Sequence, residues 1–336
     1  MEKQTYASAG VDIDAGLKIK KVIAALAQPT FGPEVMRGIG FFGGLYQFGG
    51  YRQPVLVSHV DGVGTKMKIA IALDRHDTIG VDIVNHCVND IFVGGAKPLF
   101  FQDYLAMGKL NPDRVEKIVS GLVRACRDVG CALIGGETPE MPGIYAAQDY
   151  DLVGFIVGVV EKDDIKLGDD VKLGDVILGL PSSGLHTNGY SLVRKIFGEG
   201  QDALNTGYLE LGRTLGEALL EPHRCYYNPV KPLLRSIKCL AHITGGSFYK
   251  NIPRVLPQGF AAQIESQSWT VPPLFRIIQK AGNVEENEMF HVFNMGIGMA
   301  VICSKINVDK ILRGLPEARI IGTVVQQQTD TRVTIK

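Results

Sequence analysis

An acid, two glycines, a hydroxyl and a lysine lie close together in SHVDGVGTKMKIA, residues 58–70. The preceding run, PVLVSHV, has the β-branched residues of a strand. Gly62 and Gly64 indicate a backbone that turns sharply or lets a ligand approach closely. Asp61 near Lys66 indicates a ligand that carries both a metal ion and negative charge. We therefore expect chemistry on a metal-chelated anion at the end of this strand.

The segment GVDIVNHCVNDIFVGG is predicted to contain a helix over residues 82–92, with one apolar side. Its other side carries residues that can bind a ligand: Asp82, Asn85, His86, Asn89 and Asp90. Most polar stripes are solvated helix faces. Asp and Asn have weak helix propensity, however, which favours a functional interpretation here. Asp90 is the stronger ligand candidate because it is closer to the glycine pair after the helix.

A third acid follows a buried strand in CALIGGETPEMPGIY, residues 131–145. Glu137 comes directly after two glycines, where a carboxylate could hold a hard cation such as Mg²⁺. With Asp61 and Asp90 it would provide three carboxylates for one or more Mg²⁺ ions. Asp103 and Asp151 are further candidates. Each acid taken alone could equally be a turn or cap residue.

Two glycine-rich loops precede short helical segments, and the backbone N–H groups at a helix start can bind anions. They contain the candidate phosphate-binding residues Ser183, Gly184, His186 and Asn188, and Gly245, Gly246 and Ser247. His186 could also act as a general acid or base. The chain lacks the GxxxxGK[ST] pattern, which excludes an ordinary P-loop. His59 and His86 with Cys87 could suggest zinc, but their spacing is unconvincing and we set that interpretation aside.

The whole chain has 336 residues, a formal net charge of zero and 46% hydrophobic residues. This composition predicts a soluble globular protein of two domains, with no basic cluster of the kind that binds nucleic acid or anionic membranes. Short strands alternate irregularly with helices such as residues 111–130, which indicates α+β domains with mixed sheets. A charged, glycine-punctuated stretch places the boundary near Gly168, giving domains 1–168 and 169–336. Six scattered cysteines without a CxxC pair indicate free thiols in a cytoplasmic protein.

These motifs together closely resemble the phosphoribosylformylglycinamidine cyclo-ligases, or aminoimidazole ribonucleotide synthetases, of purine biosynthesis. The resemblance runs nearly end to end, through YASAGVDIDAG, SHVDGVGTKMKIA, CVNDIFVGGAKPLFFQDYLA, GGETPEMPGIY, GLPSSGLHTNGYSLVRKI and HITGGSFYKNIPRVLP. It implies a homodimer paired through the sheets of its amino-terminal domains. It also implies that ATP and formylglycinamidine ribonucleotide give ADP, phosphate and aminoimidazole ribonucleotide, after phosphoryl transfer to the formyl oxygen. The alternatives are another ATP-dependent member of the superfamily or a non-catalytic nucleotide-binding relative.

The resemblance also implies residue roles. Asp61, Asp90 and Glu137 would hold Mg²⁺, and Lys66 and His186 are the catalytic candidates. The ATP-binding residues would be Asp14, Gly62, Gly64, Thr65, Lys66 and Asn89, whereas the loops around residues 183–188 and 245–247 would serve the substrate. The chain departs from the family pattern at Ser247, where a third glycine is usual, at Pro139 and at His86. Ser247 would be strained if its φ is positive.

Overall fold

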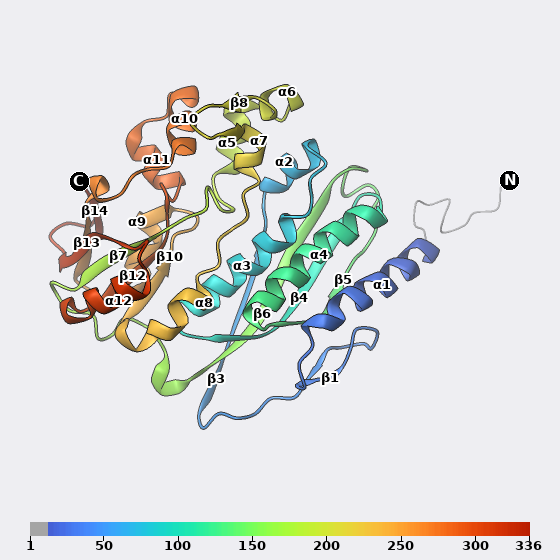
Figure 1. The fold of residues 1–336 in the computed structure, drawn as a ribbon, viewed down its shortest axis with the longest axis horizontal. Helices are drawn as coiled ribbons and strands as arrows, with labels where there is room; N and C mark the ends of the chain where they lie inside the picture. Colours follow the sequence, from blue (N-terminus) through green and yellow to red (C-terminus); the bar gives the residue numbers. More distant parts are fainter. Residues whose placement is uncertain (1–12) are drawn as a thin grey trace. The chain divides into compact units, whose positions relative to one another are not determined.

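The computed structural model describes the backbone of residues 13–336 (Figure 1). Side chains are described from residue 16 onward. The chain forms two compact units. The N-terminal unit contains residues up to Ile91 and Lys97–Glu161, and the C-terminal unit contains Phe92–Ala96 and Lys162–Lys336. Each unit combines helices with a mixed sheet, so the predicted α+β class is confirmed. Within residues 13–336, no helix has both the length and the apolar character needed to cross a lipid bilayer.

The N-terminal unit is built on a four-stranded sheet in the order β3-β6-β4-β5. β6 pairs antiparallel with β3 and β4, whereas β4 and β5 are parallel. The strands of this unit are β1 (Val35–Arg37), β2 (Leu45–Tyr46), β3 (Pro54–Gly62), β4 (Lys97–Met107), β5 (Ala132–Glu137) and β6 (Tyr150–Glu161). Its helices are α1 (Ile13–Ala27), α2 (Lys66–Ala72), α3 (Ile79–Phe92) and α4 (Pro112–Val129).

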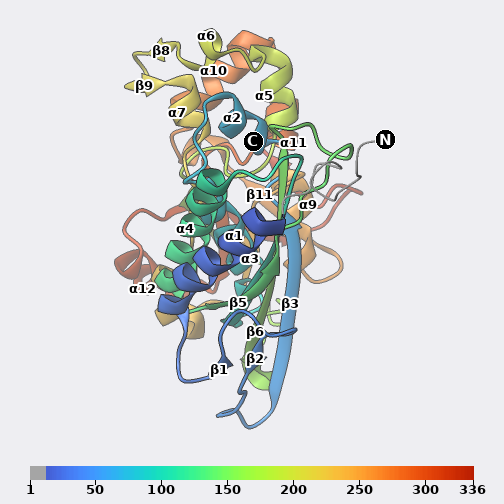
Figure 2. The same cartoon turned by 90° about the vertical axis from the view of Figure 1, so that its right-hand side faces the viewer.

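Helices cover one face of this sheet, as Figure 2 shows for α1 and α4 beside β3 and β6. β3 alternates accordingly: Leu56, Ser58 and Val60 are exposed, whereas His59 and Asp61 are partly buried on the helix-facing side. The strand thus brings two polar side chains, two residues apart, to the same face as α3.

Helix α4 forms where its sequence predicts. The Asn111 side chain accepts a hydrogen bond of 3.0 Å from Arg114 N–H, which caps the first turn. Gly130 ends the helix with φ of 67°, in the left-handed region that glycine adopts without strain.

Helix α3 differs from the expectation in its start and in its surroundings. It begins at Ile79, three residues before the predicted start, and residues 79–89 are all buried. A Cβ at Gly80 would lie only 2.2 Å from the Ile118 carbonyl oxygen, so this glycine lets α3 and α4 approach closely. The polar side of α3 therefore faces the interior, where each polar group needs a partner.

The C-terminal unit contains a six-stranded sheet in the order β10-β12-β7-β13-β11-β14. Its strands are β7 (Val176–Pro181), β8 (Gly207–Tyr208), β9 (Arg213–Thr214), β10 (Cys239–His242), β11 (Phe260–Ile264), β12 (Ile297–Cys303), β13 (Arg319–Gln326) and β14 (Val333–Ile335). Its α-helices are α5 (Tyr190–Phe197), α6 (Gln201–Leu204), α7 (Leu215–Leu219), α8 (Tyr227–Val230), α9 (Ser247–Asn251), α10 (Pro273–Gly282), α11 (Glu286–Val292) and α12 (Val308–Gly314).

The neighbouring strands β10, β12 and β7, of which β10 is at the edge of the sheet, position the two glycine-rich loops of this unit. β7 leads into the loop at 182–189, and β10 leads into the loop at 243–246. Asn294, just before β12, ties this end of the sheet together: its side chain donates to the Gly184 carbonyl at 2.9 Å and accepts from the Ser182 hydroxyl at 3.0 Å.

Candidate active site

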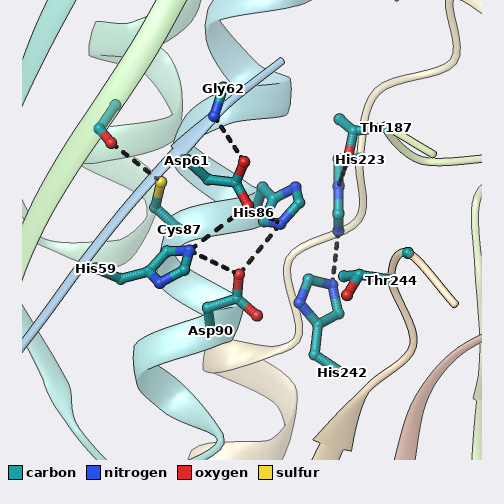
Figure 3. A network of polar contacts seen from close by, with 12 residues as sticks. His59, Asp61, Gly62, His86, Cys87, Asp90, Thr187, His223, His242 and Thr244 are labelled. Atoms are coloured by element: carbon teal, nitrogen blue, oxygen red, sulfur yellow. Dashed lines mark hydrogen bonds and ion pairs between the residues drawn. The ribbon is translucent and has the colours of Figure 1, made fainter. Parts of the chain in front are cut away.

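Four side chains of the N-terminal unit converge at the end of β3, and we call them the His/Asp cluster: His59, Asp61, His86 and Asp90 (Figure 3). β3 supplies His59 and Asp61, and α3 supplies His86 and Asp90 one helical turn apart. His86 Nε2 lies 3.1 Å from Oδ2 of both Asp61 and Asp90. His59 Nε2 lies 3.0 Å from Asp90 Oδ2 and 3.7 Å from Asp61 Oδ2. The structure thus joins two predicted metal ligands to two histidines.

The carboxylates and imidazoles of this cluster shift one another's pKa values. The nearby carboxylate of Asp61, and then that of Asp90, raises the pKa of His59 to about 9. Burial alone would lower the pKa of His86, but the same carboxylates outweigh it and raise that pKa to about 9. Burial would raise the pKa of Asp61, whereas the two histidines hold it far below its usual range. At neutral pH both imidazoles are therefore cations that face carboxylates.

Lys66 lies in a buried ion pair rather than on an open surface. Its Nζ is 2.8 Å from Asp82 Oδ1, and both side chains are 0% exposed. Lys66 is the first residue of α2 and Asp82 lies in the first turn of α3, so the pair fixes the two helices together. The predicted contact of Lys66 with a nucleotide stays a prediction, and this geometry supports a positioning role.

Glu137 lies away from the His/Asp cluster because of the strand order. In the sheet register Asp61 pairs with Gly154, Gly154 with Asp103, and Asp103 with Gly136. Three strand spacings of about 4.8 Å place Asp61 and Gly136 about 14 Å apart. One ion holds ligand oxygens about 4 Å apart, so this backbone separation favours more than one ion if Glu137 is a ligand. The role of Glu137 as a metal ligand stays a prediction.

The residues predicted to bind ATP differ in their exposure and in their hydrogen bonds. Gly62 N–H donates to Asp61 Oδ1 at 2.7 Å, and Gly64 has φ of 73° and open space where a Cβ would be. Thr65 is exposed, and Asn89 is buried within α3. The side chain of Asp14 lies outside the described residues. Gly64 and Thr65 are therefore the exposed part of this loop, and Asp61 is oriented by the glycine that follows it.

In the C-terminal unit, His186 lies in the loop after β7. It is buried, and its Nε2 accepts a hydrogen bond of 3.2 Å from Ser183 N–H, which places a neutral ring's proton on Nδ1. The Ser183 hydroxyl donates to the Pro222 carbonyl at 2.6 Å. The catalytic role predicted for His186 stays a prediction.

The second glycine-rich loop lies against the first. A Cβ at Gly245 would be 3.2 Å from Asn188 Oδ1, so the predicted substrate-binding residues of the two loops are neighbours. Gly246 has φ of 79° and Ser247 has φ of 50°. Ser247 is fully buried, and its hydroxyl donates to the Phe293 carbonyl at 2.5 Å. The strain expected for this serine is present, and a hydrogen bond that glycine cannot make offsets it.

A second group of buried histidines was missed by sequence reasoning. His223 Nε2 lies 2.9 Å from His242 Nε2 (Figure 3). The rings of His186 and His223 stack with centroids 4.0 Å apart. In the first unit, sequence reasoning had grouped His59 and His86 with Cys87, whose thiol instead points to the Gly154 carbonyl at 3.8 Å. The spacing of His59 two residues from Asp61, and of His86 four from Asp90, was the available signal for the His/Asp cluster.

Comparisons with known proteins identify the family. Residues 46–160 match the family described as AIR synthase related protein, N-terminal domain, and residues 172–335 match its C-terminal domain. The chain is 51% identical over 341 residues to the phosphoribosylformylglycinamidine cyclo-ligase of Caldicellulosiruptor bescii, covering 99% of each chain. The chain belongs to this family. It is also 53% identical over 318 residues to the cyclo-ligase of Desulfitobacterium hafniense, covering 94% of this chain and 93% of that one.

Solved structures share the fold of the cyclo-ligase family at much lower identity. Thiamine-monophosphate kinase from Stenotrophomonas maltophilia aligns with a TM-score of 0.65 and 17% identity, over 94% of this chain and 95% of that one. The hydrogenase maturation protein HypE in complex with ATP aligns with a TM-score of 0.67 and 17% identity, over 94% and 90%. These likenesses confirm the two-domain fold with mixed sheets.

Proposed function

We propose that the chain catalyses the reaction for which its relatives are named: ring closure of formylglycinamidine ribonucleotide to aminoimidazole ribonucleotide, with conversion of ATP to ADP and phosphate. The observation that carries this proposal is the 51% identity to a cyclo-ligase over 99% of both chains. A different acceptor, as in the kinase and HypE neighbours, is disfavoured because those proteins are only 17% identical.

We assign ATP to the N-terminal unit. A structural neighbour is solved in complex with ATP, and the loop at 62–65 ends beside two carboxylates that suit a phosphate-bound cation. Asp61 and Asp90 are hard oxygen ligands and fit Mg²⁺ in kind, whereas the imidazoles beside them do not. When bound, Mg²⁺ would neutralise charge on the transferred phosphoryl group. Gly62 orients Asp61, and the Lys66–Asp82 pair fixes α2 and α3 around the loop.

We assign the ribonucleotide substrate to the paired loops of the C-terminal unit. Asn188 and Gly245 are neighbours there, and Gly245 is exposed. The hydrogen bond from Ser183 N–H fixes the orientation of the buried His186 ring, which supports a role for His186 in holding the first loop in place. Asn294 fixes the first loop through Ser182 and Gly184, and the Ser247 hydroxyl ties the second loop to the neighbouring Phe293 carbonyl, which supports a preformed site.

We also propose that the chain forms a homodimer through the open face of the N-terminal sheet. This face carries exposed apolar side chains from neighbouring strands: Leu56, Val60, Tyr104 and Phe155. Val60 and Phe155 are direct register partners, so the side chains form a continuous patch. Contiguous apolar surface of this kind marks interaction sites.

The carboxylate of Asp61 provides the sharpest test of the nucleotide site. Asp61→Asn keeps the shape and the hydrogen bond from Gly62 but removes the charge, so turnover should fall at least about 100-fold. Asp163→Asn, in the surface turn after β6, is the matched control and should leave turnover unchanged. Near-normal turnover of Asp61→Asn in the presence of ATP and Mg²⁺ would remove Asp61 from the site.

A further inference from the structure

The donor atoms of the His/Asp cluster do not match an all-oxygen magnesium site. Mg²⁺ prefers carboxylates, phosphates and water in an octahedron, whereas two imidazoles with two carboxylates suit transition-metal dications. Among the described residues, His59, Asp61, His86 and Asp90 each offer one ligand atom, and these four atoms all lie within 4.8 Å of one another. One ion could thus meet all four.

The nitrogen-to-oxygen distances in this cluster are close to those of a tetrahedral metal site. Zinc binds histidine nitrogen and carboxylate oxygen at about 2.0–2.2 Å, which puts neighbouring ligand atoms about 3.3–3.5 Å apart. The four nitrogen-to-oxygen distances are 3.0, 3.1, 3.1 and 3.7 Å. His59 Nε2 is buried and has no hydrogen bond in proper geometry within the described part of the chain, although Asp90 Oδ2 is 3.0 Å away. A cation between the two atoms would satisfy both.

The second histidine group provides a contrast. Two imidazoles on one zinc ion must keep their ring centres about 5 Å apart or more. The His59 and His86 ring centroids are 6.5 Å apart, whereas those of His186 and His223 are 4.0 Å apart in a stack. His186 Nε2 is already an acceptor for Ser183 N–H. The three buried histidines of the C-terminal unit thus cannot all ligate one ion as they lie.

We propose that His59, Asp61, His86 and Asp90 form a tetrahedral binding site for a transition-metal dication of the Zn²⁺ type. The inference uses two carboxylates of the proposed nucleotide site, but it does not need that function to be correct. An ion held by four side chains has no open coordination position. It would therefore occupy Asp61 and Asp90 in competition with Mg²⁺-ATP, and act as an inhibitor rather than as a catalyst.

The test uses tag-free, full-length protein, stripped of metal with a chelator and titrated with Co²⁺ alone. We expect the intense visible absorption of tetrahedral Co²⁺ at one equivalent per chain. Zn²⁺ should abolish the band stoichiometrically, and a roughly 1,000-fold excess of Mg²⁺ should not. Absence of the band, or its loss to Mg²⁺, would overturn the proposal. Because no nucleotide or substrate is present, the result is independent of ligase activity.

Three histidine variants locate the ion. His59→Ala removes a partly exposed ligand with little risk to folding, and should weaken Co²⁺ binding at least about 100-fold. His291→Ala removes an exposed histidine of α11 and should bind as the wild type does. His223→Ala should also retain the band. Loss of the band in His223→Ala but not in His59→Ala would place the ion in the C-terminal unit and refute this assignment.

A kinetic measurement tests the predicted competition in chains that are active. Zn²⁺ should raise the apparent KM for Mg²⁺-ATP in the wild type, and His59→Ala should need at least about 10-fold more Zn²⁺ for the same effect. Zn²⁺ that accelerates turnover would contradict a closed site.

Discussion

The Lys66–Asp82 ion pair links two helices that flank the proposed nucleotide loop, and its removal has a predictable magnitude. Both side chains are 0% exposed and their charged atoms are 2.8 Å apart. Removing one partner of such a pair leaves an uncompensated buried charge, which costs about 3–5 kcal/mol. Asp82→Asn and Lys66→Met should therefore each lower stability by about that amount. The double variant buries no charge and should lose less than about 2 kcal/mol.

Calorimetry of the three variants provides the assay. At about 2–4 °C per kcal/mol, each single substitution should lower Tm by roughly 6–20 °C, and the double variant should recover most of that loss. A double-variant loss equal to the sum of the single losses would refute the reasoning, because additivity means that the two side chains do not interact. The KM of the double variant for ATP then tests whether Lys66 also contacts the nucleotide.

Three further predictions concern single side chains. Ser247→Ala keeps the positive φ but loses the hydrogen bond to Phe293, so the free energy of unfolding should fall by about 1–2 kcal/mol. Ser247→Gly should stay within about 1 kcal/mol of the wild type. Denaturant titration measures both variants, and equal stability of the two would contradict this order. Burial raises the pKa of Asp103 to about 7, so the unfolded chain releases this proton near its ordinary pKa of 3.8 while the folded chain keeps it. The free energy of unfolding should consequently fall by up to about 4 kcal/mol as pH rises from about 4 to 7. Asp103→Asn should remove that decline. An unchanged decline in the variant would show that Asp103 is not the group responsible. Gly80→Ala places a methyl group 2.2 Å from the Ile118 carbonyl oxygen and should lower the free energy of unfolding by about 1–3 kcal/mol. The loss should appear as a lower Tm. An unchanged Tm would mean that α3 and α4 are not in close contact.

Local sequence signals were sufficient to predict elements whose ends carry capping or helix-ending residues. Helix α4 could be predicted because Asn111 caps it, Pro112 suits its first turn and Gly130 ends it. The start of α3 was missed because that helix has apolar and polar residues that are buried alike, so periodicity does not distinguish its faces. Its polar residues find partners on other elements, as Asp82 does with Lys66, 16 residues earlier.

The site was predicted in part for a similar reason. Asp61 and Asp90 stand at recognisable glycine-flanked ends, and the structure brings them together. The separation of Glu137 from Asp61 depends on β6, which comes last in this unit but lies between β3 and β4 in the sheet. Strand order of this kind is set by long-range pairing, which no local pattern encodes. The spacing of His59, His86 and Cys87 does not indicate a metal site, yet alternation along β3 places His59 on the same face as Asp61.

The most direct test of the proposed activity is to incubate the purified chain with formylglycinamidine ribonucleotide, ATP and Mg²⁺, and to measure ADP and aminoimidazole ribonucleotide together. We predict that the two products form in equal amounts, and that neither forms without ATP or Mg²⁺. Release of ADP without the imidazole would show that the phosphoryl acceptor is a different molecule. The absence of both products from folded, ATP-binding protein would contradict the assignment as a cyclo-ligase.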